Sequence, residues 1–174
     1  MQTVQFEDGD IVFRRGIGMA SQAVLLSEKN SMYSHAGLVF IIKHCPYVIH
    51  AVPGESGSEA EVMKCEKLTS FLDYHKATRA GIYRCSSNEK HVGAMALKQA
   101  KIAFDKRLKF DDAYDLDSDD KLYCTELIWK SYRAAGIDLI KGRFDLINIP
   151  LYKGLVILPG SFIHSESLTE IYSY

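Results

Sequence analysis

Cys124 is the residue of this chain with the clearest chemical potential. It stands where an acidic, turn-prone stretch, residues 119–121, leads into an apolar-periodic segment that predicts a helix from residue 124 to residue 135. The thiol should therefore fall in the first turn of that helix. Unpaired backbone N–H groups and the positive end of the helix dipole favour a thiolate there. The sequence thus predicts a nucleophile, against the alternative of a buried cysteine that acts as a small apolar residue.

Two histidines far upstream lie in strand-like surroundings, His35 in the run YSHAG and His50 in the run PYVIHA. A cysteine at a helix start with histidines elsewhere is the plan of a nucleophile with a general base, and we expect His35 to be the base. His50 is embedded in apolar residues, where an imidazole needs a hydrogen-bond partner, and we expect it to orient His35. Taken singly, each histidine also has a purely structural interpretation.

Three further residues are candidates for substrate binding. Gly37 follows His35 by two residues, projects to the same face of the strand and leaves open space beside the imidazole. Tyr33 and Tyr123 flank the expected cleft and are predicted to line it, although both also suit ordinary core positions. The glycines of the loop at residues 53–60 would permit that loop to close over the site.

The hairpin that carries the two histidines sets a condition on this site. Two β-branched and aromatic runs separated by residues 43–46 predict the hairpin. A symmetric turn at His44 and Cys45 places His50 opposite Val39, on the face of His35 but four residues along. Four residues span roughly 13 Å. A direct contact between the histidines therefore requires a bulge, an asymmetric turn or a strong bend.

The surrounding pattern predicts one α+β domain over residues 1–174, with an antiparallel sheet packed on helices. Ser87 suits an N-cap and Gly136 suits a C-cap. We expect strands at residues 9–14, 38–42, 47–52, 61–65 and 80–84, and helices at residues 19–28, 68–74, 87–106 and 124–135, followed by a partly extended tail.

Composition excludes several classes of function. At 174 residues, with 47% apolar and 25% charged residues, the chain suits a single globular core. A formal net charge of −1 without a basic run argues against nucleic acid as a partner. No run approaches the roughly 18 apolar residues that span a bilayer, so we expect no transmembrane segment. The compartment stays open: cytoplasmic if Met1 is the native start, cell-envelope or exported if a signal peptide was removed.

Neither a metal nor another cofactor is expected. The four cysteines form no C-x-x-C pair and are expected to be reduced. One cysteine and two histidines could hold zinc in an open geometry, but no sequence-local ligand pair supports this. The aspartates at residues 111–120 lack the glycine and the terminal glutamate of a calcium loop. They favour a solvated acidic turn that leads into the helix of Cys124.

Four motifs in order resemble the YiiX/YaeF-like permuted papain-like enzymes of the NlpC-type superfamily. They are GDIVF at residues 9–13, SHAG at residues 34–37, PYVIHA at residues 46–51 and DDKLYCTEL at residues 119–127. In ordinary papain-like enzymes the cysteine helix precedes the histidine strand, and this chain is similar to the permuted family in having the histidine first. The resemblance implies an α+β, circularly permuted papain-like (NlpC-type) fold.

The resemblance also implies a mechanism. Cys124 would attack an amide or ester carbonyl, His35 would be the base, and His50 would hold the orienting position, where family members often carry glutamate. The implied function is a cysteine-dependent acyl-transfer hydrolase, amidase or peptidase-like, whose partner is a peptide or lipid-like acyl substrate. The alternatives are a lipid acyl hydrolase or acyltransferase, and a non-catalytic binding module that retains the fold. The sequence does not predict the oligomeric state.

Overall fold

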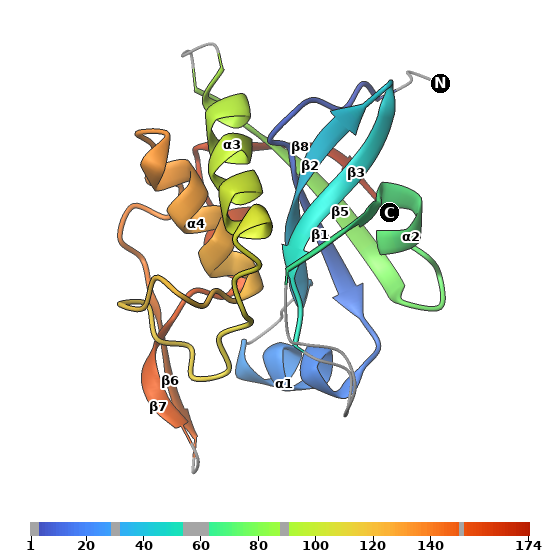
Figure 1. Cartoon of the computed structure of the whole chain (residues 1–174). Coiled ribbons are helices and arrows are strands. Elements are labelled where there is room, and N and C mark those ends of the chain that lie inside the picture. Colours follow the sequence, from blue (N-terminus) through green and yellow to red (C-terminus); the bar gives the residue numbers. More distant parts are fainter. Residues whose placement is uncertain (1–3, 29–31, 54–62, 88–90, 150–151) are drawn as a thin grey trace.

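A six-stranded antiparallel sheet forms the centre of the computed structural model (Figure 1), which describes residues 4–28, 32–53, 63–87, 91–149 and 152–174. The strands lie in the order β4-β3-β2-β1-β5-β8. Their bounds are β1 Ile11–Gly16, β2 His35–Ile42, β3 Cys45–Ala51, β4 Met63–Lys67, β5 Ala77–Cys85 and β8 Leu168–Ser173. A separate hairpin is formed by β6 Asp145–Ile149 and β7 Tyr152–Val156.

Helices cover both faces of the sheet. The bounds are α1 Met19–Ser27, α2 Leu68–Phe71, α3 Val92–Asp105, α4 Cys124–Ala134 and α5 Pro159–Ile163. The strands separate α3 and α4 from α2 (Figure 1). Alternate strand residues point to opposite faces, so Ile11 and Leu38 join the larger core with α3 and α4, while Val12 and Val48 pack with Phe71 of α2. None of the described helices is long and apolar enough to cross a membrane.

The predicted antiparallel sheet packed on helices is confirmed, with differences at element ends. Helix α3 begins at Val92 with His91 as its N-cap, not at Ser87. Along α3, Met95 is 51% exposed, whereas Leu97 is buried. The predicted loop at residues 53–60 lies, beyond residue 53, outside the described residues.

The turn between β2 and β3 is one residue earlier than the sequence suggests. Ile42 pairs with Cys45, which leaves Lys43 and His44 as a two-residue turn. Their φ angles are 47° and 65°, and two positive values are the signature of the type I′ turn that matches strand twist. The usual Asn-Gly signal is missing from this turn, which is why the symmetric reading placed its centre one residue too late.

This shift changes the partner of His50. Leu38 pairs with Ile49, so the next pair along the two strands is Gly37 with His50. The predicted pairing of His50 with Val39 is wrong, because moving a turn by one residue moves every cross-strand partner by two. His50 is thereby brought two residues closer to His35, on the same face of the sheet.

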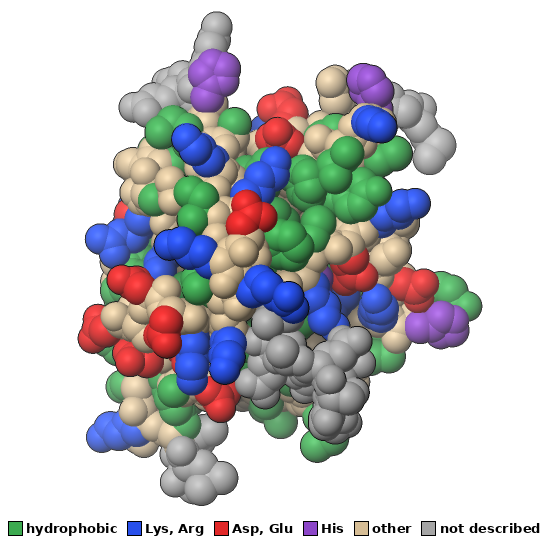
Figure 2. All heavy atoms as spheres, in the orientation of Figure 1, with side chains coloured by type: hydrophobic (Ala, Val, Ile, Leu, Met, Phe, Trp, Pro, Cys, Tyr) green, Lys and Arg blue, Asp and Glu red, His purple; other side chains and the backbone are tan. Residues whose placement is uncertain are grey.

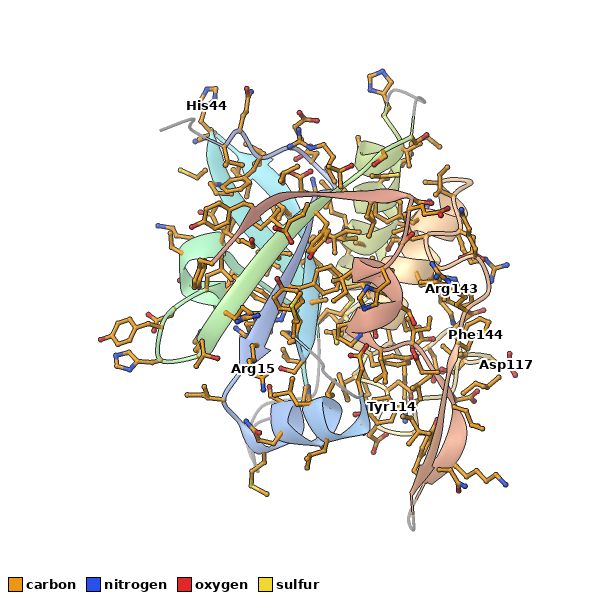
Figure 3. All side chains as sticks on the ribbon, turned by 180° about the vertical axis from the view of Figure 1, so that it is seen from behind. Arg15, His44, Tyr114, Asp117, Arg143 and Phe144 are labelled. Carbon is orange, nitrogen blue, oxygen red and sulfur yellow. The ribbon has the colours of Figure 1, made fainter. Side chains whose placement is uncertain are left out.

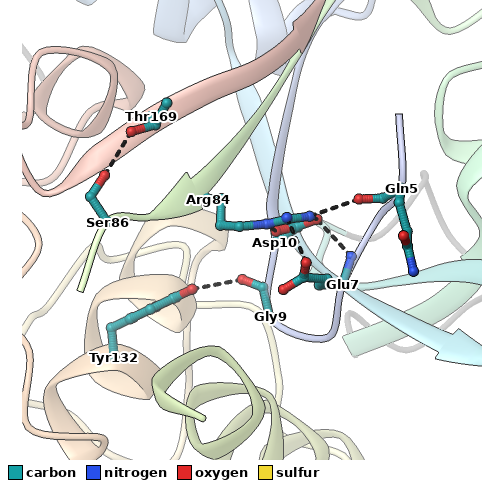
Figure 4. Close-up of polar contacts among 8 residues, drawn as sticks. All are labelled: Gln5, Glu7, Gly9, Asp10, Arg84, Ser86, Tyr132 and Thr169. Carbon is teal, nitrogen blue, oxygen red and sulfur yellow. Dashed lines mark hydrogen bonds and ion pairs between the residues drawn. The ribbon is translucent and has the colours of Figure 1, made fainter. Parts of the chain in front are cut away.

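A polar network holds the loop before β1 against its neighbours (Figure 4). The Arg84 guanidinium donates to both carboxylate oxygens of Asp10, at 2.8 Å each, and to Glu7 at 2.7 Å. Tyr132, near the end of α4, donates its hydroxyl to the carbonyl of Gly9 at 2.7 Å. The C-terminal half of the cysteine helix is therefore fixed to the sheet. On the face shown in Figure 2, side chains of both charge signs are interspersed.

Candidate active site

Cys124 is the first residue of α4, and Tyr123 is the N-cap. The side chain is partly exposed. Burial of the sulfur raises the pKa of Cys124, and the nearby backbone N–H groups of Ala36 and Thr125 lower it only in part. The position at a helix start is as the sequence predicts, whereas burial opposes the stabilised thiolate that the helix terminus favours. The loss of solvation outweighs the helix terminus, so the net effect is a raised pKa of the thiol.

The residues on either side of Cys124 anchor the start of α4. The Tyr123 hydroxyl accepts a hydrogen bond from the Ile157 N–H at 2.9 Å. The Thr125 hydroxyl donates to the Ile157 carbonyl at 2.6 Å. One residue just beyond β7 is thus held by both neighbours of the cysteine. Tyr123 is 3% exposed, so its predicted role in lining the cleft is wrong and its role in this structure is to fix the helix.

Glu126 completes the helix start. Its carboxylate accepts a hydrogen bond from the Tyr123 N–H at 3.2 Å, as the third helical residue does in a capping box. Lys130 lies 3.1 Å from the other oxygen. The side chain has no exposed surface, and this burial raises the pKa of Glu126 to about 7, although Lys130 opposes the shift. No sequence pattern indicates this titration, because it depends on burial.

The two histidines are in direct contact. His35 Nε2 and His50 Nδ1 are 2.9 Å apart, and both side chains are buried. Phe71 stacks on His35 with ring centroids 5.5 Å apart and meets His50 edge-on at 5.0 Å. Phe71 itself is fully buried, so it excludes water from this hydrogen bond. Burial, with the neighbouring charges of His50 and Arg14, lowers the pKa of His35 well below its usual range.

Glu66 of β4 extends the polar chain beyond the histidines. Its Oε1 atom is 3.2 Å from His50 Nε2, and its Oε2 atom is 3.2 Å from Lys76 Nζ. The His50 contact is the largest cause of a pKa of Glu66 lowered to about 2, and Lys76 adds to it. The carboxylate is therefore ionised. Sequence reasoning missed Glu66 because its place depends on the pairing of β3 with β4, which no local pattern specifies.

Arg14 is the cross-strand partner of His35 and was also missed. Its guanidinium lies 4.3 Å from the centre of the Phe71 ring and donates to the Phe71 carbonyl at 2.7 Å. Burial lowers the pKa of Arg14, whereas the charges of Glu66 and Cys124 raise it. A guanidinium stays protonated in proteins, so the site holds a permanent positive charge, which would attract a negative charge on the Cys124 sulfur.

The structure brings the thiol to the end of β2 where His35 lies. The Ala36 N–H next to His35 approaches the sulfur, and a negative charge on that sulfur would raise the pKa of Arg14, which pairs with His35. Among the described residues, no side-chain hydrogen bond joins Cys124 to His35. Catalytic hydrogen bonds are often long in free enzymes and shorten when substrate binds.

The other two predicted substrate residues do not line open space. A side chain at Gly37 would begin 2.4 Å from Val48 Cγ1 and 3.0 Å from His50 Cβ. The space beside His35 is therefore filled by β3, and Gly37 permits the approach of His50 to His35. Tyr33 is 1% exposed and stacks on Phe13 with centroids 5.7 Å apart. The prediction that Tyr33 lines the cleft is wrong, because the side chain belongs to the core.

The described residues hold no group of three histidine, cysteine, aspartate or glutamate side chains that could bind a metal ion. His35, His50 and Glu66 face one another in a chain of contacts and do not converge on one point.

A helix that begins at a cysteine, next to a strand that begins at a histidine, is the arrangement of the papain-like fold. Here the histidine strand precedes the cysteine helix, so the fold is the circularly permuted form. The chain belongs to the family described as permuted papain-like amidase enzymes, YaeF/YiiX, C92, whose model matches residues 5–172. This bears out the resemblance carried by the four sequence motifs.

Two relatives agree with this assignment. The uncharacterized protein YiiX of Escherichia coli K12 is 28% identical over 134 residues, which are 75% of this chain; the chain spans 59% of that relative's length. A crystal structure described as metalloprotein yiiX from Escherichia coli O157:H7 superposes with a TM-score of 0.78. It is 24% identical and the match covers 98% of each chain, which shows a shared fold.

Proposed function

We propose that this protein is a cysteine hydrolase that cleaves an amide or ester through an acyl-enzyme on Cys124. The observation that carries the proposal is the position of Cys124 at the start of α4, against the Ala36 N–H; Ala36 directly follows His35, whose Nε2 is bonded to His50. His50 occupies Nε2 of His35, so Nδ1 is the nitrogen left for the thiol.

The reaction would begin from a neutral pair. His35 Nδ1 takes the Cys124 proton as the sulfur attacks the carbonyl carbon, and the backbone N–H groups at the start of α4 stabilise the oxyanion. The C–N or C–O bond then breaks, and His35 returns the proton to the leaving group. Water, deprotonated by His35, attacks the thioester and releases the acid and the thiol. His50 holds the His35 ring in place throughout.

A groove of about 750 Å³ lies beside α4; Trp129, Lys130 and Arg133 of α4 line it, whereas Cys124, His35 and His50 do not. Tyr114 borders it and packs on Tyr123, with ring centroids 5.1 Å apart. Its walls also carry Asp117, Arg133 and Lys153, and Figure 3 shows Tyr114 and Asp117 beside the β6–β7 hairpin. Charges of both signs would complement a peptide better than a hydrocarbon chain if a substrate extends from Cys124 into this groove.

A metal-dependent step is not part of the proposal. The related crystal structure is described as a metalloprotein, but the side chains of the described residues here do not assemble three metal ligands. The donors at the site contact each other, and all steps above use protein groups.

The test is acyl transfer from p-nitrophenyl acetate, followed by intact-mass measurement and peptide mapping. We expect one acetyl group on Cys124, turnover that is lost in Cys124→Ala, and a slow acylation in His35→Ala. Cys45 is exposed and serves as the reference thiol within the same molecule. Acetylation of Cys45 at the same rate as Cys124, or turnover that survives in Cys124→Ala, would refute the proposal and favour a binding module. Acyl-peptide and phospholipid substrates, compared next, separate the two hydrolase alternatives.

A further inference from the structure

Glu66 lies between His50 and Lys76 in a continuous chain of polar contacts. In β4 it pairs with Val48, and its side chain lies on the face of the sheet that carries His50. The chain of contacts runs from His35 to His50 at 2.9 Å, from His50 to Glu66 at 3.2 Å, and from Glu66 to Lys76 at 3.2 Å. The glutamate side chain is 23% exposed and that of Lys76 is 48% exposed. The contact between His50 and Glu66 is an ion-pair contact and not an aligned hydrogen bond.

We propose that Glu66 is a positioning residue that fixes the tautomers of His50 and His35, so that the unprotonated Nδ1 of His35 is offered to Cys124. The effect on acylation by Cys124 rests on the proposed function, whereas the effect on the histidine tautomers does not. His50 has no carboxylate, and in this proposal Glu66 supplies the carboxylate that orients the histidine pair.

Glu66 determines which nitrogen of each imidazole carries the proton. A neutral imidazole carries one N–H and one lone pair, and an ionised carboxylate only accepts. Glu66 therefore favours the proton of His50 on Nε2, which leaves His50 Nδ1 as an acceptor. The hydrogen bond at 2.9 Å must then be donated by His35 Nε2. His35 Nδ1 keeps its lone pair and can take a proton from the thiol.

The opposite arrangement would disable the base. If His50 carried its proton on Nδ1, its Nε2 lone pair would face the carboxylate at 3.2 Å, where two acceptors repel. His50 would donate to His35 Nε2, and His35 would hold its proton on Nδ1, where it cannot accept the thiol proton. One carboxylate two groups away thus decides whether His35 is a base.

The surrounding charges make this contact necessary. Arg14 lowers the pKa of both histidines, and Lys64, opposite His50, lowers that of His50 further. Among the charges near His50, Glu66 acts in the other direction. Phe71 excludes water from the pair, so solvent cannot replace the carboxylate as acceptor for a buried imidazole N–H.

The test compares Glu66→Gln with wild type and with Lys76→Met. The amide can turn its NH₂ toward His50 and donate, whereas Lys76→Met removes the outer ion pair and keeps the carboxylate. Long-range ¹H–¹⁵N spectra of histidine-labelled protein, assigned from variants that each lack one histidine, report the tautomer of each ring. The same variants are assayed for Cys124 acetylation by p-nitrophenyl acetate.

In wild type and Lys76→Met we expect His35 protonated on Nε2, with acylation rates within about twofold of each other. In Glu66→Gln we expect His35 to shift toward the Nδ1–H form and kcat for acylation to fall at least tenfold with little change in KM. Replacing the direct carboxylate partner of a catalytic histidine costs roughly 10⁴-fold. An unchanged His35 tautomer in Glu66→Gln overturns the inference. If wild type transfers no acetyl group, the proposed function fails, and the spectra still decide the role of Glu66.

Discussion

Glu126→Gln removes a buried carboxyl that titrates near neutral pH, and its effect on stability has a definite sign. In the unfolded chain this carboxyl loses its proton near its ordinary pKa of 4.5, whereas burial raises the pKa of Glu126 in the folded protein to about 7. Between these values the folded state binds more protons than the unfolded state. The stabilising contribution is therefore fully present below pH 4.5 and is lost as the pH rises through 7.

The size of this loss follows from the two pKa values. Their difference corresponds to roughly 3 kcal/mol of unfolding free energy, which is meaningful because the side chain has no exposed surface. Glutamine is neutral at every pH and keeps an oxygen for the Tyr123 N–H. Lys130 retains Asp119 at 3.0 Å and the Ser118 carbonyl as partners, so the substitution does not leave its charge unpaired.

The assay is urea unfolding of both proteins at intervals from pH 4.5 to pH 8. The lowered pKa values of His35 and His50 make stability rise with pH over part of this range, so the informative quantity is the difference between wild type and Glu126→Gln. We expect this difference to change by about 3 kcal/mol across the range and to level off above pH 7. Glu166→Gln, at a surface ion pair with Lys141, is the control. Parallel curves for wild type and Glu126→Gln would refute the buried titration.

Three other predictions concern the same region. Iodoacetamide should alkylate Cys124 with a pH midpoint above the ordinary value of about 8.5, because burial raises the pKa of the thiol; a midpoint below that value would show a preformed thiolate. Phe71→Ala should lower the unfolding free energy by about 3–5 kcal/mol and admit water to the histidine pair, so a stability loss under 1 kcal/mol would contradict the packing described. Gly37→Ala should cost about 1–3 kcal/mol by overpacking, because its Cβ would lie 2.4 Å from Val48 Cγ1; Gly18→Ala, with open space around it, should be tolerated.

The sequence predicts the helix start of Cys124, the histidine strands and their order, because each depends on local patterns. An acidic turn before an apolar-periodic segment is sufficient to place a thiol in the first turn of a helix. β-branched runs around a short polar segment are sufficient for a hairpin. That residues 1–174 form a single domain, and that Cys124, His35 and His50 act in catalysis, stay predictions.

Register and burial are the parts that the sequence could not supply. The turn at Lys43 and His44 lacks the glycine that usually marks a positive φ, so a symmetric reading misplaced it and separated the histidines. Gly37 illustrates the consequence, because its missing side chain makes room for His50 and not for a substrate. The pKa of Cys124 is the second case, since the helix terminus is visible in the sequence while the burial that outweighs it is not.

The charges around the site suggest how a resting neutral pair is made reactive. Burial raises the pKa of Cys124 and lowers that of His35, so both shifts oppose a thiolate–imidazolium pair in the free protein. Arg14, however, interacts electrostatically with the Cys124 sulfur, and Glu66 contacts His50 on the side away from His35. Proton transfer would then place a negative sulfur near the cation and a positive imidazole on the side of the carboxylate. Arg14 favours only the thiolate and Glu66 favours only the imidazolium. Together they favour the ion pair once a bound substrate brings the thiol and His35 into contact.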